Sequence, residues 1–428
     1  MVMRERKKRI YRKRIPYGMQ NFEDVIERDC YYVDKTPFIE DIEEANMYFF
    51  YIRPRRFGKS LTLSMLENYY DINKKDKFEK IFGKLYIGEN PTSERNSYLI
   101  IHLNFAKITN EPNNFIQAFN EYCNKVFEDF VDKYLSLLPV EIKKELKSYN
   151  TAVSQFSYLC GQCGMANLKL YLFIDDYDYL SRLYLTNGRS HVGGSVHTPE
   201  EQCMAQFFAA IKGAAAGTAL QRMFITGEFP VNYGGLTSGF NIGTNYSFSL
   251  CFNELMGFSE EEVRDVFNYY ASGLPFRHSV DELIQVIKTW CGNYCFLERM
   301  SGKVMMYNSA MVFYFLNSYI QNGYEIPDKM LGTNIWMGYN EKCELLRHSE
   351  SASQRISIIQ KVFTKGFVLG KLKENFPAEN INDSDNFLSN LFYLGVVTVD
   401  GAYQGATKFV IPNDMVRNHL MAVRLIAT

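Results

Sequence analysis

The 428-residue sequence lacks any run of eighteen apolar residues, and it has no excess of one charge. The first absence argues against a membrane-spanning helix, which needs about 20 apolar residues. The charges nearly balance, since 47 basic and 48 acidic side chains give a formal net charge of −1. This balance removes any global electrostatic argument for nucleic-acid binding. We expect a cytoplasmic protein of two or three domains, since a domain usually takes ~150 residues.

Disulfide and zinc chemistry also have little support. The nine cysteines are scattered, and an odd number without a secretory signal indicates reduced thiols. Cys160 and Cys163 have the spacing of half a zinc or redox motif, but no second cysteine pair or paired histidine set stands at ligand distance. We therefore expect no metal site at these cysteines.

The one local excess of charge lies at the N-terminus. Residues 1–14 hold eight basic side chains against the single acid Glu5. Such a cluster can bind phosphates or anionic lipid, or it can be a solvated leader. It is not a signal peptide, because no apolar stretch follows it. We predict a basic, disordered leader over residues 1–14.

Residues 49–60 carry the main functional signal. An aromatic and β-branched run over 47–52 is followed by Arg-Pro-Arg-Arg-Phe-Gly-Lys-Ser (53–60) and by a helix-forming segment over 61–70. In a P-loop the backbone N–H groups face a polyphosphate, Lys59 reaches its β and γ oxygens, and the Ser60 hydroxyl joins the Mg²⁺ shell. Arg53 stands where the pattern GxxxxGK[ST] has its first glycine. We predict that the nucleotide is bound by Arg55, Arg56, Phe57, Gly58, Lys59, Ser60 and Leu61.

The rest of residues 47–227 alternates strands with helices. Apolar runs at 98–105, 168–174 and 222–226 predict strands, and periodic segments at 113–137 and 199–214 predict helices. This alternation predicts an α/β fold, a P-loop NTPase parallel sheet with helices on both faces.

The chain changes character after residue 255. Capping boxes begin at Ser259 and Ser279 and predict two helices. Short strands at 396–399 and 408–411, around a turn at Asp400-Gly401, predict a terminal hairpin. We therefore expect a mostly helical, winged-helix-like C-terminal region. The predicted domains are a leader (1–14), a P-loop domain (15–255) and a helical lid with the winged-helix-like region (256–428).

The second half of a nucleotide site follows the strand at 168–174. Asp175 ends this apolar strand, the Walker B pattern, so Ser60 and Asp175 are the predicted Mg²⁺ ligands. Asp176 comes next and is the candidate catalytic acid. Thr226, at a strand end, is either a sensor of the γ-phosphate or an ordinary turn residue. Arg53, Arg55 and Arg56 either face the phosphates or pair with acids such as Asp178.

These strings together resemble the AAA-ATPase-like family of bacterial P-loop proteins, many of which carry a C-terminal PD-(D/E)XK nuclease-like domain. The resemblance covers nearly the whole chain from residue 15, and it implies that Arg53 is the family's own form of the loop. It rests on the segments at 15–22, 32–36, 53–60, 173–178, 224–227, 238–241, 257–263, 290–296, 393–398 and 411–413.

Two positions depart from the family pattern. Asp176 replaces a glutamate, and the proline common after Tyr-Asp is absent around Tyr179. The resemblance implies that a nuclease-like domain would begin at about Thr428, where the sequence stops. No Asp…Glu-x-Lys set follows residue 411, so we expect no nuclease activity.

The resemblance and the site predict an ATP-binding protein with ATP and Mg²⁺ as cofactors. It would be a Mg²⁺-dependent ATPase or a nucleotide-gated switch of the AAA/STAND-like type. The alternative is a non-hydrolysing scaffold, or a module for nucleic acid or a protein partner, that uses the basic N-terminus and the winged-helix-like region. A homo-oligomer is also open, and Arg222 or Arg264 could then act as an arginine finger.

Overall fold

The computed structural model describes residues 12–108, 114–186, 198–232, 242–327, 352–374, 376–377 and 383–422. No helix within these ranges is long and apolar enough to cross a membrane. Of the predicted leader, residues 1–11 lie outside the described part of the chain. Arg12 and Arg14 lie inside it, and Arg12 Nη1 donates to the Tyr270 carbonyl at 2.7 Å. The family-like segment at 238–241 also lies outside the described residues.

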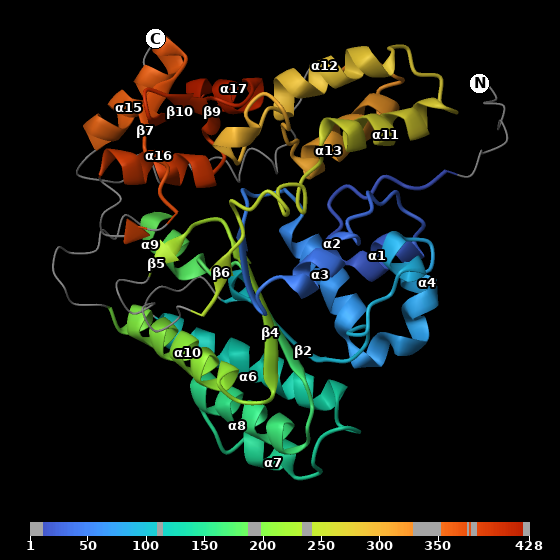
Figure 1. Ribbon diagram of the computed structural model, residues 1–428, viewed down its shortest axis with the longest axis vertical. Helices are drawn as coiled ribbons and strands as arrows, with labels where there is room; N and C mark the ends of the chain where they lie inside the picture. The colour runs from blue at the N-terminus through green and yellow to red at the C-terminus, as the bar shows by residue number, and fades with distance from the viewer. Residues whose placement is uncertain are drawn as a thin grey trace, which may run out of the picture.

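A five-stranded parallel sheet lies at the centre of the predicted P-loop domain (Figure 1). Its strand order is β2-β3-β4-β1-β6, so β4 is inserted between β1 and β3. The prediction of a parallel α/β sheet is therefore confirmed. The strands are β1 (Tyr48–Ile52), β2 (Leu99–Asn104), β3 (Leu170–Asp175), β4 (Leu220–Gly227) and β6 (Thr244–Asn245).

Helices cover both faces of this sheet, as predicted. Strand β3 shows why, since all six of its residues are buried. Tyr171 and Phe173 enter one apolar cluster, while Leu172 and Ile174 enter another on the opposite face. The first face carries α1 (Phe22–Glu27), α2 (Phe38–Glu44), α3 (Lys59–Tyr70) and α4 (Phe78–Phe82), and the second carries α6 (Phe115–Lys133), α7 (Ile142–Leu146), α8 (Ala152–Met165) and α10 (Pro199–Ala215).

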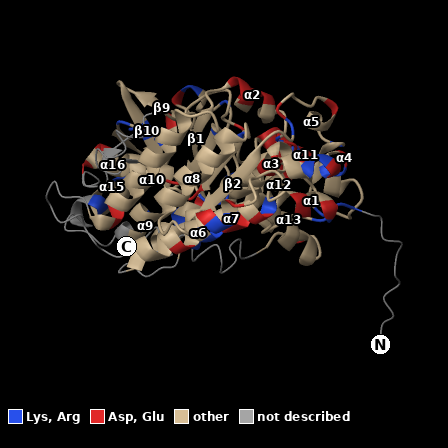
Figure 2. Cartoon of the chain, turned by 90° about the horizontal axis from the view of Figure 1, so that it is seen from below, with Lys and Arg blue, Asp and Glu red and all other residues tan. Residues whose placement is uncertain are grey.

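Shorter elements connect these layers. They are η1 (Ile72–Lys77), α5 (Tyr86–Glu89), η2 (Phe105–Lys107), α9 (Tyr179–Thr186) and β5 (Val231–Asn232). Cys160 and Cys163 are both buried in α8, where burial raises the pKa of each thiol. Basic and acidic residues are interspersed over the face that Figure 2 shows, in keeping with the balanced composition.

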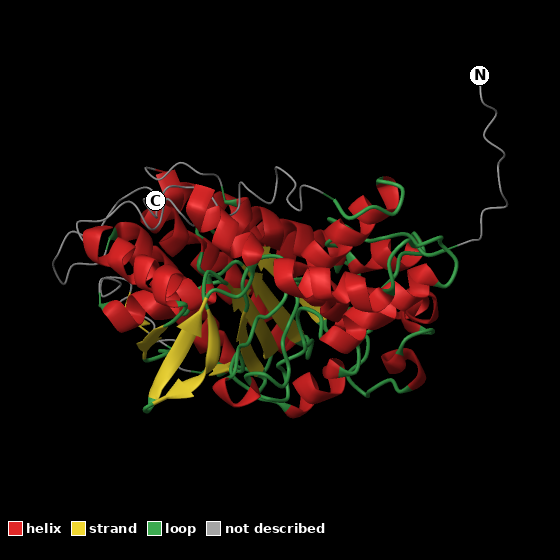
Figure 3. Cartoon of the chain, turned by 90° about the horizontal axis from the view of Figure 1, so that it is seen from above, coloured by secondary structure: helices red, strands yellow, loops and turns green. Residues whose placement is uncertain are grey.

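The C-terminal region begins with helices whose starts the sequence predicted. Ser259 and Ser279 each form a reciprocal capping box with the glutamate three residues later. The elements are α11 (Glu260–Ala271), α12 (Val280–Cys291), η5 (Glu298–Met300), α13 (Ser309–Gln321), α15 (Ala352–Lys365), β7 (Val368–Gly370), β8 (Phe376–Pro377), α16 (Ser384–Tyr393), β9 (Thr398–Tyr403), β10 (Ala406–Val410) and α17 (Asp414–Ala422). Strands β7, β10 and β9 form an antiparallel sheet apart from the central one (Figure 3).

The turn of the terminal hairpin is not where the sequence placed it. Gln404 and Gly405 form the turn, with φ angles of +52° and +78°, which suit the two-residue loop of a hairpin. Asp400 and Gly401, the predicted turn, instead lie within β9, where the register slips by one residue against Lys408. Gly401 has a φ of +76°, so this glycine supplies a bulge and not the chain reversal.

Candidate functional site

The loop between β1 and α3 has the backbone that its sequence predicts. Gly58 precedes the first residue of α3 with a φ of +97°, a conformation that side chains with a Cβ rarely adopt. Arg56 is also left-handed, at +71°. These two residues turn the chain sharply between Ile52, where β1 ends, and Lys59, where α3 begins.

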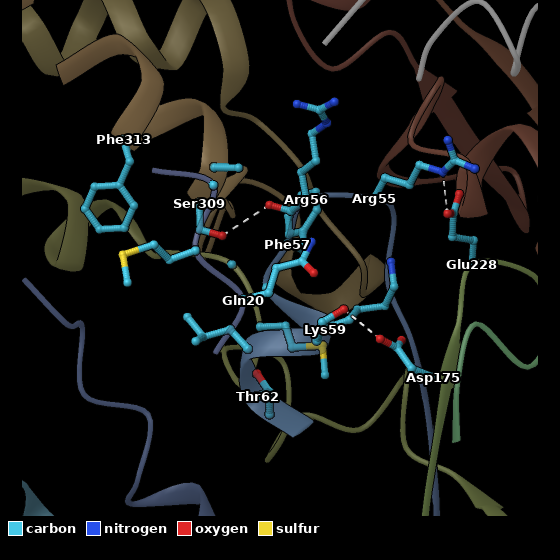
Figure 4. Close-up of a pocket in the computed structure, with 18 of the residues that line it drawn as sticks. Gln20, Arg55, Arg56, Phe57, Lys59, Thr62, Asp175, Glu228, Ser309 and Phe313 are labelled. Carbon is cyan, nitrogen blue, oxygen red and sulfur yellow. Dashed lines mark hydrogen bonds and ion pairs between the residues drawn. The ribbon is translucent and has the colours of Figure 1, made fainter. Parts of the chain in front are cut away.

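A cavity of about 790 Å³ opens over this loop (Figure 4). Its volume lies in the range of about 300–1,000 Å³ that small-molecule sites usually have. The structure brings nine of the predicted site residues together in its lining, which are Arg55, Arg56, Phe57, Gly58, Lys59, Ser60, Leu61, Asp175 and Asp176.

Lys59, Ser60 and Asp175 form the polar floor of this cavity. Lys59 Nζ donates to the carbonyl of Arg53 at 3.0 Å. Ser60 Oγ donates to Asp175 Oδ2 at 2.6 Å, and Asn104 Nδ2 donates to the same oxygen at 3.2 Å. Burial, and then the charge of the neighbouring aspartate, raises the pKa of Asp175. A cation at this oxygen would offset both effects.

Asp176 belongs to a cluster of ion pairs at one end of the cavity. Arg182 Nη2 donates to Asp176 Oδ1 at 2.8 Å, and Arg182 Nη1 donates to Glu228 Oε1 at 2.7 Å. Arg55 Nε donates to that same glutamate oxygen at 2.6 Å. Asp178 lies 3.6 Å from Arg182 Nε and accepts two backbone N–H groups. Burial raises the pKa of Asp178 to about 6.

The ion pairs of this cluster differ from the pairing with Asp178 that the sequence suggested for the loop arginines. Arg55 pairs with Glu228 and not with Asp178, whose cation is Arg182. Sequence reasoning missed Glu228, although the signal was present. An acid directly after Gly227, at the carboxyl end of β4, stands at the edge of the sheet where Asp175 also ends its strand.

Arg53 does not point at the cavity. Its guanidinium is stacked between the rings of Tyr51, at 4.3 Å, and Phe296, at 4.2 Å. Arg53 Nη1 donates to the carbonyls of Ile52 and Ser247, and the residue is 2% exposed. The position of the first P-loop glycine therefore holds a buried cation that joins the sheet to the C-terminal region.

The structure does not bring Thr226 to the cavity. Thr226 Oγ1 donates to the Tyr51 carbonyl at 2.7 Å, and the side chain is buried in the sheet. Arg222, considered as an arginine finger, lies earlier in β4 and pairs with Glu94 at 2.7 Å. Arg264, the other candidate, pairs with Asp281.

Much of the cavity wall comes from segments that the site prediction did not include. Two of them, 15–22 and 32–36, carried the family resemblance, but neither contains a catalytic pattern. A third lies at the start of α13. Additional lining residues labelled in Figure 4 are Gln20, Thr62, Glu228, Ser309 and Phe313, and Arg182 and Gly257 also line the cavity.

The parallel sheet with β4 between β1 and β3, and the loop-to-helix turn beneath the cavity, define a P-loop NTPase fold. The family model described as "Predicted AAA-ATPase" matches residues 16–237, which is more than half of the chain. The chain therefore belongs to the AAA-ATPase-like family, and the expectation from its motifs is confirmed.

Two known proteins are similar to the chain. One is an "Uncharacterized protein in vnfD 5'region" from Azotobacter chroococcum mcd 1, 50% identical over 56 residues. That match covers 13% of this chain and 11% of the relative. The other is the crystal structure of Cdc6p from Pyrobaculum aerophilum, at 12% identity and a TM-score of 0.31, covering 88% of this chain and 86% of that one.

Proposed function

We propose that the protein binds ATP with Mg²⁺ in the cavity over the β1–α3 loop and acts as a Mg²⁺-dependent ATPase or a nucleotide-gated switch. One observation carries this proposal. The Ser60 hydroxyl and the Asp175 carboxylate meet at 2.6 Å in the same cavity that holds Lys59. A hydroxyl and a carboxylate beside an ammonium group form the donor set that Mg²⁺ and a polyphosphate need together.

Each residue then has a distinct role. Lys59 would exchange its bonds to loop carbonyls for bonds to the β- and γ-phosphates, and the loop N–H groups would hold the phosphate oxygens. Ser60 and Asp175 would hold the Mg²⁺, which neutralises charge on the phosphates when bound. Asp176, the second of the two adjacent aspartates, would orient the attacking water molecule.

The ion pair of Asp176 favours the switch over continuous turnover. A general base must reach the attacking water, and here the carboxylate is bonded to Arg182 at 2.8 Å. Hydrolysis would require this pair to open. We therefore expect the protein to bind ATP and to release phosphate slowly.

Calorimetric titration of ATP and ADP, with and without Mg²⁺, tests the proposal, and phosphate release is measured on the same samples. Lys59→Ala should abolish ATP binding. Lys169→Ala is the control, because this exposed lysine directly precedes β3, at the amino end of the strand and away from the carboxyl end that holds Asp175. Undiminished ATP affinity in Lys59→Ala, or no binding by the wild-type chain, would refute the assignment.

Binding with phosphate release would favour the ATPase, and binding without release would favour the switch. The alternative function is a scaffold, or a module for nucleic acid or a protein partner, that uses the basic leader (1–14) and the winged-helix-like region. Residues 1–11 of that leader lie outside the described part of the chain. This alternative stays a prediction with its own test below.

A further inference from the structure

The C-terminal region holds the carbonyl groups of the β1–α3 loop. Asn308 Nδ2 donates to the Arg55 carbonyl at 3.1 Å. Ser309 Oγ donates to the Arg56 carbonyl at 3.2 Å, as Figure 4 shows. Both donors stand at the N-terminus of α13, so the start of this helix lies directly against the loop. Two successive loop carbonyls are thus fixed by residues more than 250 positions away in the sequence.

The next carbonyl of the loop is held in the same way. The Gly257 N–H donates to the Phe57 carbonyl at 2.8 Å. The Phe57 side chain is 1% exposed and makes edge-to-face contacts with Tyr294 and Phe296 of the C-terminal region. Three consecutive carbonyls and one aromatic side chain therefore tie the loop to the C-terminal region.

Because the peptide group is planar, these contacts also set the orientation of the loop N–H groups. In a planar trans peptide the C=O and the following N–H point in opposite directions. Fixing the carbonyls of Arg55, Arg56 and Phe57 toward the C-terminal region therefore aims the N–H groups of Arg56, Phe57 and Gly58 to the other side. These loop residues line the cavity, and loop N–H groups are what hold phosphates in a P-loop.

We infer that Asn308, together with Ser309 and Gly257, is a positioning residue that sets the loop N–H groups for the nucleotide phosphates. This inference rests on the proposed function, because it concerns the same site. Coupling between two regions is reciprocal in free energy. A nucleotide that requires this loop conformation will therefore stabilise the placement of α13 against the loop.

Asn308→Ser separates this role from the role of Asn308 in the helix. Asn308 Oδ1 also caps α13 by accepting from the Met311 N–H at 3.2 Å. Serine is an equally good capping residue and is neutral, so the cap and the charge are both kept. Serine lacks the amide that reaches the Arg55 carbonyl, so the variant loses that one donor.

Asn413→Ser is the matched control. Asn413 Nδ2 donates to the Gly292 carbonyl at 2.9 Å, and its Oδ1 accepts from the Val416 N–H at 3.1 Å. Asn413 is 6% exposed and Asn308 is 3% exposed, so the two asparagines match in chemistry and burial. The described bonds of Asn413 go to Gly292 and Val416, whereas Asn308 holds the Arg55 carbonyl of the loop, so the Asn413 substitution tests the general cost of the change.

ATP titrations of the full chain with Mg²⁺ compare wild type, Asn308→Ser and Asn413→Ser, and thermal melts without nucleotide confirm that the variants fold. We expect Asn308→Ser to bind ATP roughly three- to tenfold more weakly, the usual effect of one hydrogen bond, and Asn413→Ser to bind as wild type. If the ATP affinities of Asn308→Ser and Asn413→Ser lie within twofold of each other, the inference is overturned. The proposed function still stands in that case, provided that wild type binds ATP. No binding by wild type would overturn both.

Tryptophan fluorescence gives a second readout that a merely structural role would not change. Trp290 precedes Cys291, whose carbonyl accepts from the Asn308 N–H at 3.5 Å. In a Trp336→Phe background Trp290 is the single tryptophan that remains. Saturating ATP should change its emission, and Asn308→Ser should reduce that change while Asn413→Ser preserves it. Unchanged emission on saturation, or equal changes in both variants, would overturn the coupling.

Discussion

Replacing Arg182 with leucine should expose how much the ion-pair cluster contributes to stability. Arg182 is 11% exposed at its side chain and contacts three carboxylates, at 2.8 Å for Asp176, 2.7 Å for Glu228 and 3.6 Å for Asp178. The side chains of Glu228 and Asp178 are 2% and 0% exposed. Arg182→Leu leaves Arg55 on Glu228 and removes the cation described for Asp178.

The expected loss is large because a buried charge without its partner cannot be solvated. Removing one member of a buried pair usually costs about 3–5 kcal/mol of unfolding free energy. An exposed pair is worth about 0–1 kcal/mol. Arg264→Leu is therefore the control, since Arg264 pairs with Asp281 at 2.5 Å but their side chains are 39% and 79% exposed.

The raised pKa of Asp178 determines how the free energy of unfolding changes with pH. The pKa of Asp178 is raised to about 6 in the folded protein, from about 3.9 for an unfolded aspartate. The folded state therefore binds more protons between these values, and stability falls as the pH rises through them. Without Arg182 the folded pKa rises further, because Arg182 lowers it. Wild type then stops losing stability near pH 6, whereas the variant continues to lose it.

Urea unfolding at pH 5, 6.5 and 8, followed by circular dichroism, measures this difference. We expect the gap between wild type and Arg182→Leu to widen with pH and to reach about 3–5 kcal/mol at pH 8. Arg264→Leu should stay within about 1 kcal/mol at every pH. A gap at pH 8 no larger than that of Arg264→Leu, or one that narrows as the pH rises, would refute the reasoning.

Three further predictions concern the catalytic acid, the loop and the leader. Asp176→Asn should slow phosphate release by at least ~100-fold with little change in ATP affinity, and an unchanged rate would exclude Asp176 as the base. Gly257→Ala should destabilise the protein by about 1–3 kcal/mol in urea unfolding, because φ is +85° and a Cβ would stand 2.7 Å from Phe57 Cδ1. Gly302→Ala, at +70° with nothing within 4 Å, should cost less, and equal costs would contradict this account. If the alternative function holds, DNA affinity should fall with salt at a log–log slope of about −0.9 per phosphate, and deletion of residues 1–14 should weaken it. A deletion without effect on DNA affinity would exclude the leader as a DNA-binding segment.

The sequence by itself determined the features that depend on neighbouring residues. The strand, loop and helix around Gly58 and Lys59 follow from residues within one segment, as do the buried runs that became β2, β3 and β4. The capping boxes at Ser259 and Ser279 also close over three residues. Local propensity, burial pattern and short-range hydrogen bonds fix all of these, so their signals are contiguous in the chain.

Tertiary structure decided which distant groups meet. The pairing of Arg55 with Glu228, the stacking of Arg53 on Phe296 and the bond from Asn308 to the loop join residues that lie 173 to 253 positions apart. The hairpin makes the same point on a smaller scale, since pairing with β10 made Gly401 a bulge. Contacts of this kind arise from burial and hydrogen-bond satisfaction in the folded core, and they leave no periodic pattern along the chain.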